Sequence, residues 1–229
     1  MKIALEEHFI LPDFIGYLDK AMPKVPAEGR AALIAAMLDF GDQRFAAMDA
    51  AGVEMAVLSL SGPGVQVEPD TAVAIRMARL ANDQLAGKIA PRPDRYAGFA
   101  HLAMQDAAAA ADELERCVSQ LGFVGAMVNG QTNGVYLDDA RYDVFWERLQ
   151  ALDVPLYLHP GDSFKLPYVL EGAPELLKPT WNGTSRPRRT FCGWCSPACS
   201  TVFRASRSFS AIWARRCPMC CGGSTAVPR

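Results

Sequence analysis

An α/β fold built on a parallel sheet is expected from two patterns in this sequence. Short, almost continuous apolar runs alternate with longer segments whose apolar residues recur at helical spacing. The alternation passes through four helices and ends on a fifth strand. Strands of this kind are buried on both faces, which is typical of a parallel sheet with helices outside it. With 229 residues, half of them hydrophobic, the chain can bury one sizeable core.

Each of the five expected strands is a short apolar run. The first starts at Lys2 and ends in Leu5-Glu6-Glu7-His8, and the last likewise ends in His159. The expected ranges are 2–8, 53–60, 96–102, 123–128 and 154–159.

Four helices are expected between these strands, at 31–51, 70–88, 106–121 and 140–152. Gly52 and Gly122 lie where C-terminal caps belong, and Asp70 is a candidate N-terminal cap. Residues 9–30 contain three prolines and are expected to form one long loop, which is usually functional in a compact domain.

The sheet could stay open and doubly wound or curl into a barrel. No Gly-rich phosphate loop follows the first strand, which weakens a Rossmann interpretation. Polar residues instead end the strands, as in the mouth of a (β/α)8 barrel. They are Glu6, His8, Ser61, His101, Asn129 and His159. Five strands cannot close a barrel of eight, so three strands of a complete barrel are missing.

Glu6 and His8 are candidate metal ligands because of their spacing. Side chains two residues apart on a strand point the same way, so these two share a face and Glu7 points away. A carboxylate and an imidazole that converge from one strand end can hold a divalent cation. His159 ends the fifth strand and is the third candidate, whereas His101 is expected to be a core or rim histidine.

The composition changes near residue 181, which predicts a domain at 1–181 and an atypical tail at 182–229. Residues 1–181 hold all 25 acidic residues and carry a formal charge of −10. The tail has eight Arg, no Lys, no acidic residue and no Leu, and it holds six of the seven Cys. The two parts are different kinds of sequence.

A series of short motifs resembles the type-2 amidohydrolases related to aminocarboxymuconate-semialdehyde decarboxylase, and most closely the γ-resorcylate and dihydroxybenzoate decarboxylases. The similarity covers residues 2–181 in register. The motifs are Ala4-Leu5-Glu6-Glu7-His8-Phe9, Arg44-Phe45-Ala46-Ala47-Met48-Asp49, Leu58-Ser59-Leu60, Asn82-Asp83, Arg92-Pro93-Asp94-Arg95-Tyr96, Leu121-Gly122-Phe123-Val124-Gly125-Ala126, Val128-Asn129-Gly130, Tyr136-Leu137-Asp138-Asp139, Phe145-Trp146 and Tyr157-Leu158-His159-Pro160.

This resemblance implies a metal-dependent hydrolase TIM (β/α)8 barrel, here truncated to about five βα units with an irregular C-terminal tail. It implies Zn or Mn bound by Glu6, His8 and His159, with a small aromatic carboxylic acid as substrate. Ser61 and Asn129 are expected to contact that substrate. The family also uses an Asp after strand eight and a His in a Gly-His-x-Gly-Glu stretch after strand six, and neither is found in this sequence.

The implied reaction is the non-oxidative decarboxylation of a hydroxybenzoate, with the metal chelating its carboxylate and ortho-hydroxyl and the missing Asp as the proton donor. The catalytic acid of this chain is therefore unknown, and turnover of the chain as written is expected to be impaired. A metal-dependent hydrolase of the same superfamily is the alternative.

The tail has three interpretations. Cys192-x2-Cys195 and Cys217-x2-Cys220 have the spacing of a structural zinc site, which would make the tail a binding module in a non-enzymatic protein. A disulfide-rich secreted segment is disfavoured by the absence of an export signal. A reading-frame shift near Trp181 is favoured, because codons for Ser210 to Arg215 can be written so that the shifted frame encodes Gly-His-Leu-Gly-Glu.

Composition also bounds the partners and the location. The net charge of −2 lacks the excess of positive charge that is typical of nucleic-acid-binding proteins. No apolar run approaches the roughly 20 residues that span a bilayer, and no signal peptide opens the chain, so neither a membrane nor export is expected. We expect a cytoplasmic protein and, as the family implies, a homo-oligomer.

Overall fold

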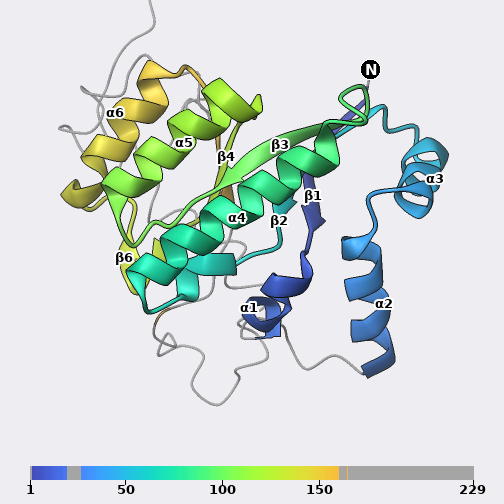
Figure 1. The fold of residues 1–229 in the computed structure, drawn as a ribbon, viewed down its shortest axis with the longest axis horizontal. Helices are drawn as coiled ribbons and strands as arrows, with labels where there is room; N and C mark the ends of the chain where they lie inside the picture. Colours follow the sequence, from blue (N-terminus) through green and yellow to red (C-terminus); the bar gives the residue numbers. More distant parts are fainter. Residues whose placement is uncertain (1, 20–26, 160–163, 165–229) are drawn as a thin grey trace, which may run out of the picture.

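The computed structural model describes residues 2–19, 27–159 and 164, and its main feature is a parallel sheet of five strands (Figure 1). The strands lie in the order β1-β2-β3-β4-β7, so each successive strand is added at the same side of the sheet. Their bounds are β1 Ile3–Phe9, β2 Met55–Leu60, β3 Tyr96–His101, β4 Gly125–Asn129 and β7 Leu156–His159. A separate antiparallel pair consists of β5 Gln131–Thr132 and β6 Val135–Tyr136.

Helices connect the strands and cover one face of the sheet. In Figure 1, α4 and α5 run alongside each other over the sheet with α6 beside α5, while α2 and α3 lie near β1. The α-helices are α1 Ile15–Asp19, α2 Ala27–Leu38, α3 Asp42–Ala50, α4 Thr71–Ile89, α5 Ala107–Leu121 and α6 Asp143–Ala151. Three short 3₁₀ helices are η1 Pro12–Phe14, η2 Gly64–Val67 and η3 Ala140–Tyr142.

The sheet is strongly curled. Adjacent strands lie about 4.8 Å apart, so β1 and β7 would be separated by about 19 Å in a flat sheet of this order. Yet the rings of His8 on β1 and His159 on β7 have centroids only 5.1 Å apart. The five strands therefore form part of a barrel wall, with the two outer strands facing each other across its interior. The expectation of about five βα units of a barrel is confirmed.

Hydrophobic side chains fill two regions. The larger core lies between the sheet and the helices and includes fully buried aromatic residues such as Phe14, Tyr96 and Phe145. A smaller cluster of Val57, Phe99 and Met127 packs with Tyr157 separately from that core. Because side chains alternate along a strand, this cluster belongs to the concave face of the sheet, below the residues that end the strands.

Three predicted helix caps are confirmed. The Asp70 side chain accepts a hydrogen bond from Val73 N at 3.0 Å at the start of α4. Gly52 follows α3 with φ of 64°, and Gly122 follows α5 with φ of 70°. These left-handed conformations suit glycine, which lacks the Cβ that penalises them.

The helix predicted at 31–51 is wrong as a single element, since the structure has α2 and α3 with a break at residues 39–41. The Asp39 carboxylate causes the break, because it accepts hydrogen bonds from Gly41 N at 3.2 Å and Arg44 N at 2.6 Å. A carboxylate bonded to backbone N–H groups at a helix start competes with a continuous helix.

The loop predicted at 9–30 is also partly wrong, because η1, α1 and the beginning of α2 lie within it. Pro12 occupies the first position of η1, where its missing N–H costs nothing and its fixed φ favours a helical turn. The β5–β6 hairpin was not predicted, although Asn133-Gly134, both with positive φ, is a strong hairpin signal.

The proposed domain boundary at 181/182, and with it the Cys-rich tail, lies outside the described residues. Among the residues that are described, no helix has the length and apolar character to cross a bilayer.

Candidate metal centre

Glu6, His8 and His159 converge at the carboxyl end of the curled sheet, as the sequence predicted. Glu6 Oε1 lies 3.9 Å from His8 Nε2 and 3.6 Å from His159 Nε2. The two imidazole rings meet edge to face, with an angle of 73° between their planes. One potential ligand atom from each residue lies within 4.8 Å of the others. The three side chains come from the first and the last strand of the sheet, and only the curl of the sheet brings them together.

The donor set fits a divalent metal ion. Two imidazole nitrogens and one carboxylate oxygen are ligands that zinc and manganese both accept. Metal bonds of about 2.1 Å place neighbouring ligand atoms about 3–4 Å apart, which matches the separations of Glu6 Oε1 from both imidazoles. Within the described part of the chain this is the one group of three potential ligands that are mutually close.

The local electrostatics keep His8 in the form that binds a metal. Burial lowers the pKa of His8, and the nearby His159 lowers it further, while the Glu6 carboxylate acts in the opposite direction. A neutral imidazole offers one nitrogen lone pair to a metal, whereas a protonated imidazole offers none. His8 is therefore available as a ligand at neutral pH.

Two neighbours orient the ligands. Ser59 Oγ lies 3.1 Å from His8 Nδ1, in the parallel register that pairs these two residues, and so leaves Nε2 facing Glu6 and His159. The Tyr157 hydroxyl donates a short hydrogen bond to Glu6 Oε2. Burial and that bond raise the pKa of Tyr157, so its hydroxyl keeps its proton. Partners of this kind fix the ring orientation and tautomer of metal ligands.

The end of β1 is held in place by Arg44. Its Nη2 donates to His8 O at 3.0 Å and its Nε donates to Asp39 O at 2.7 Å. The β1–β2 register also shifts between Ala4 and Glu7, which inserts an extra residue in β1 just where Glu6 lies. Such a bulge redirects side chains at the rim of a barrel.

The remaining predicted residues take different positions around this centre. Asn129 is 4% exposed and pairs with His159 in the β4–β7 register, so the two side chains share a face. Ser61 follows β2, and its backbone N–H donates to Phe9 O at 2.9 Å. His101 is a buried histidine whose Nε2 accepts a hydrogen bond from Val65 N at 3.0 Å, as expected for a satisfied core residue.

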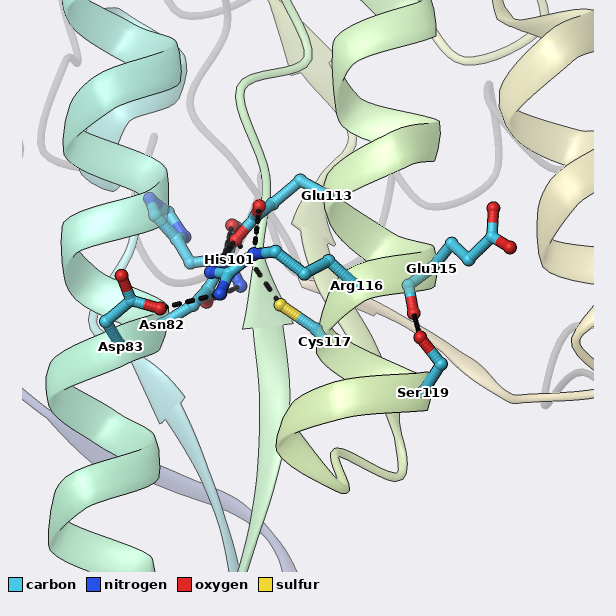
Figure 2. Close-up of polar contacts among 8 residues, drawn as sticks. All are labelled: Asn82, Asp83, His101, Glu113, Glu115, Arg116, Cys117 and Ser119. Atoms are coloured by element: carbon cyan, nitrogen blue, oxygen red, sulfur yellow. Dashed lines mark hydrogen bonds and ion pairs between the residues drawn. The ribbon is translucent and has the colours of Figure 1, made fainter.

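Sequence reasoning missed Ser59 and Tyr157. Both carried a signal, since Ser59 is the polar residue in a buried apolar run and Tyr157 lies two positions before His159, hence on the same face. It also missed the partly buried polar network beside β3 (Figure 2), in which Asn82 of α4 and Glu113 and Arg116 of α5 are joined to the backbone of His101.

Comparison with known proteins decides the family. The amidohydrolase family profile matches residues 23–220. The chain belongs to the amidohydrolase family. The γ-resorcylate decarboxylase of Rhodococcus jostii is 46% identical over 190 residues, a match that covers 79% of this chain and 57% of that protein. This amidohydrolase thus spans little more than half the length of the curated relatives it matches.

Solved structures of similar proteins agree with the fold. A dihydroxybenzoic acid decarboxylase from a Polaromonas species, with bound manganese and the inhibitor 2-nitroresorcinol, has a TM-score of 0.81 at 41% identity and covers 90% of this chain and 64% of that chain. A 2,6-dihydroxybenzoate decarboxylase complexed with 2,6-dihydroxybenzoate has a TM-score of 0.82 at 40% identity, with 90% and 65% covered. These matches confirm the amidohydrolase resemblance and the partial TIM-barrel fold.

Proposed function

We propose that this amidohydrolase chain carries the metal and substrate site of a carboxy-lyase that removes CO2 from a hydroxybenzoate such as 2,6-dihydroxybenzoate. The observation that carries the proposal is the convergence of Glu6, His8 and His159 at the carboxyl end of the strands. Support comes from the γ-resorcylate decarboxylase at 46% identity and from a similar structure that contains manganese.

Each residue has a distinct task in this proposal. Glu6, His8 and His159 hold the ion, with Ser59 and Tyr157 fixing the orientation of His8 and Glu6. The bound metal supplies a positive charge that orients a carboxylate and an adjacent hydroxyl and stabilises negative charge as CO2 leaves. Asn129 and Ser61 contact the aromatic acid, Asn129 from the position next to His159.

Turnover by this chain is proposed to be negligible. Protonation of the ring carbon needs a positioned acid, and the family places an Asp there. Within the described residues Glu6 is the one carboxylate in the cluster, and it serves as a ligand. No acidic residue follows Glu175 in the sequence. Metal binding and recognition of the acid are therefore the activities expected to persist.

Metal titration of the purified chain tests the ligand assignment. Zn²⁺ and Mn²⁺ should each bind with a stoichiometry of one, and competition between them decides which ion the site prefers. Glu6→Gln should weaken binding strongly because a charged ligand is lost. Glu7→Gln is the matched control, since Glu7 lies next in sequence but contacts Arg44 at 3.8 Å instead. Equal losses in both variants would contradict the assignment.

Substrate assays distinguish the proposed decarboxylase from the alternative, a metal-dependent hydrolase of the same superfamily. Titration with 2,6-dihydroxybenzoate should show saturable binding to the metal-loaded chain, with at most traces of resorcinol and CO2. Hydrolysis of a lactone or an amide, without binding of the hydroxybenzoate, would instead support the hydrolase alternative. Robust decarboxylation would refute the proposed loss of turnover. A cytoplasmic location and a homo-oligomeric state belong to the same proposal and are tested by fractionation and light scattering.

A further inference from the structure

The side chain of Gln66, in η2 between β2 and α4, makes several hydrogen bonds to Asn129. Gln66 Oε1 accepts from Asn129 N at 2.7 Å and from Asn129 Nδ2 at 2.9 Å. Gln66 Nε2 donates to Thr132 Oγ1 at 2.7 Å and, at longer range, to the carbonyls of Asn129 and Gln131. Gln66 is 2% exposed, so these bonds are made away from water.

These contacts determine which way both side-chain amides point. A backbone N–H can only donate, so the Gln66 atom that faces Asn129 N must be the oxygen. The same oxygen faces the Asn129 amide, which must therefore present its nitrogen to Gln66. That nitrogen also donates to Pro63 O at 3.4 Å, which uses both of its hydrogens.

The Asn129 side-chain oxygen therefore points away from Gln66. It faces Gly62, where a Cβ added to the glycine would lie 2.8 Å from it, and no described residue donates a hydrogen bond to it. Asn129 pairs with the metal ligand His159 in the β4–β7 register, so this oxygen lies on the face of the sheet that carries the metal centre.

The segment that bears Gln66 is itself firmly seated. His101 Nε2 accepts the hydrogen bond of Val65 N, and a Cβ at Gly64 would lie only 2.4 Å from the His101 ring, so the backbone rests directly on the imidazole. Gln105 Nε2 donates to Val65 O and to Glu68 O, at 2.5 and 2.8 Å. The segment is therefore held from β3 and from the turn that follows it.

His101 is held in turn from the helix layer (Figure 2). Asn82 of α4 accepts from His101 N at 2.8 Å and donates to His101 O at 2.9 Å. Glu113 of α5 accepts from Asn82 and is paired with Arg116 at 2.7 Å. The contacts thus run without a break from α5 to Asn129.

We propose that Gln66 is a positioning residue that locks the Asn129 amide in one orientation, so that its Oδ1 accepts a hydrogen bond from a hydroxyl group of the bound aromatic acid. The identity of the acid rests on the proposed function, whereas the lock itself does not. The lock favours an acid that presents a hydroxyl donor at this position over one that presents only an acceptor, because two acceptors cannot share a hydrogen bond.

Hydrogen exchange of the Asn129 side-chain amide tests the lock in the full, metal-free chain. The resonances are assigned by their loss in Asn129→Asp. Exchange should become about tenfold faster in Gln66→Met, which removes the acceptor. Gln66→Glu should restore slow exchange, because burial among carbonyls favours a protonated carboxyl that still accepts and donates. Gln105→Met is the matched control: it loosens the same segment without removing a partner of Asn129, and it should accelerate exchange far less than Gln66→Met does.

Equal acceleration in Gln66→Met and Gln105→Met would overturn the lock, and so would an unchanged rate in Gln66→Met. If Gln66→Met does not fold, Thr132→Val decides, because it removes only the partner of Gln66 Nε2. It should accelerate Asn129 exchange by about threefold, and an unchanged rate would again overturn the lock.

Binding of 2,6-dihydroxybenzoate to the Mn²⁺-loaded chain tests the acceptor. Gln66→Met should weaken this binding about tenfold and leave Mn²⁺ affinity unchanged. Undiminished binding would overturn the role of Oδ1. If the wild-type chain binds no hydroxybenzoate, the proposed function and the role of Asn129 Oδ1 in binding the acid fail together, while the exchange rates still decide whether Gln66 locks Asn129.

Discussion

Two clusters of polar side chains, one on each face of the sheet, differ in how their groups are satisfied. On the helix-covered side, Glu113 and Arg116 are 12% and 13% exposed and are bonded to each other and to Asn82. On the concave side, the side chain of Glu6 is 53% exposed and those of His8 and His159 are 24% and 22% exposed.

The contrast separates a structural network from a site. In the first cluster Glu113 accepts hydrogen bonds from both Asn82 and Arg116, and the cluster spans α4, β3 and α5. Paired polar groups of this kind stabilise one arrangement. The second gathers three potential electron-pair donors at one point and leaves them accessible, which suits the binding of a cation. Substitutions in the helix-side network should therefore change the free energy of unfolding, and substitutions in the concave cluster should change the affinity for metal.

The largest expected effect is the acid sensitivity of His101, whose backbone is bonded to the helix-side network through Asn82. Burial lowers the pKa of His101 to about 4, below its ordinary value. The unfolded chain then binds more protons than the folded chain, so stability is full above about pH 6.5 and falls by about 3 kcal/mol as the pH drops to about 4. Urea unfolding of the wild type and of His101→Gln across this pH range measures the loss of stability. Parallel pH profiles would contradict the prediction.

Removal of a ligand comes next. His159→Ala should weaken Mn²⁺ binding by about 100-fold or more, because loss of a group that only orients a ligand already costs about 10- to 100-fold. Calorimetric titration checks this. His101→Gln replaces the histidine that lies outside the cluster and should bind Mn²⁺ as the wild type does. A comparable loss in that control would contradict the assignment of His159 as a ligand.

A smaller effect is expected at Ser59, which contacts His8 Nδ1 and no other ligand atom. Ser59→Ala should weaken Mn²⁺ binding about tenfold, since the ring loses the partner that fixes its tautomer. Ser61→Ala, two residues further along, is the matched control and should leave the affinity intact. The same titration compares them, and identical affinities in all three proteins would show that Ser59 has no orienting role.

The smallest effect concerns the first turn of α5. Asp106 accepts from Ala108 N and Ala109 N, both at 3.0 Å. Asp106→Ala should lower the free energy of unfolding by about 1 kcal/mol, and Asp106→Asn, which keeps a capping oxygen, by much less. Mn²⁺ affinity should not change in either variant. Chemical denaturation and metal titration of the same samples provide both measurements.

The sequence was informative where one local rule governs the outcome. Apolar runs located the strands, Asp70 and Gly122 marked helix ends, and strand alternation placed Glu6 and His8 on one face. His159 could be added because parallel strands end at the same edge of a sheet. For these residues spacing along the chain was sufficient.

Contacts between strands were harder to predict from the sequence. The pairing of Ser59 with His8 depends on the β1–β2 register, and this register is shifted by one residue between Ala4 and Glu7. Such a shift changes which side chains are neighbours, and nothing in the local sequence specifies it. The break between α2 and α3 was missed for a related reason, because the Asp39 side chain replaces helical hydrogen bonds that apolar spacing alone predicts to be continuous.

The most direct test of the central claim is to count the nitrogen ligands of a bound ion by pulsed electron paramagnetic resonance on the Mn²⁺-loaded chain. If His8 and His159 hold the same ion, the spectrum should contain couplings from two imidazole nitrogens, and each of His8→Ala and His159→Ala should remove one of them. A spectrum without nitrogen couplings, or one that neither substitution alters, would show that the two strands do not share a metal.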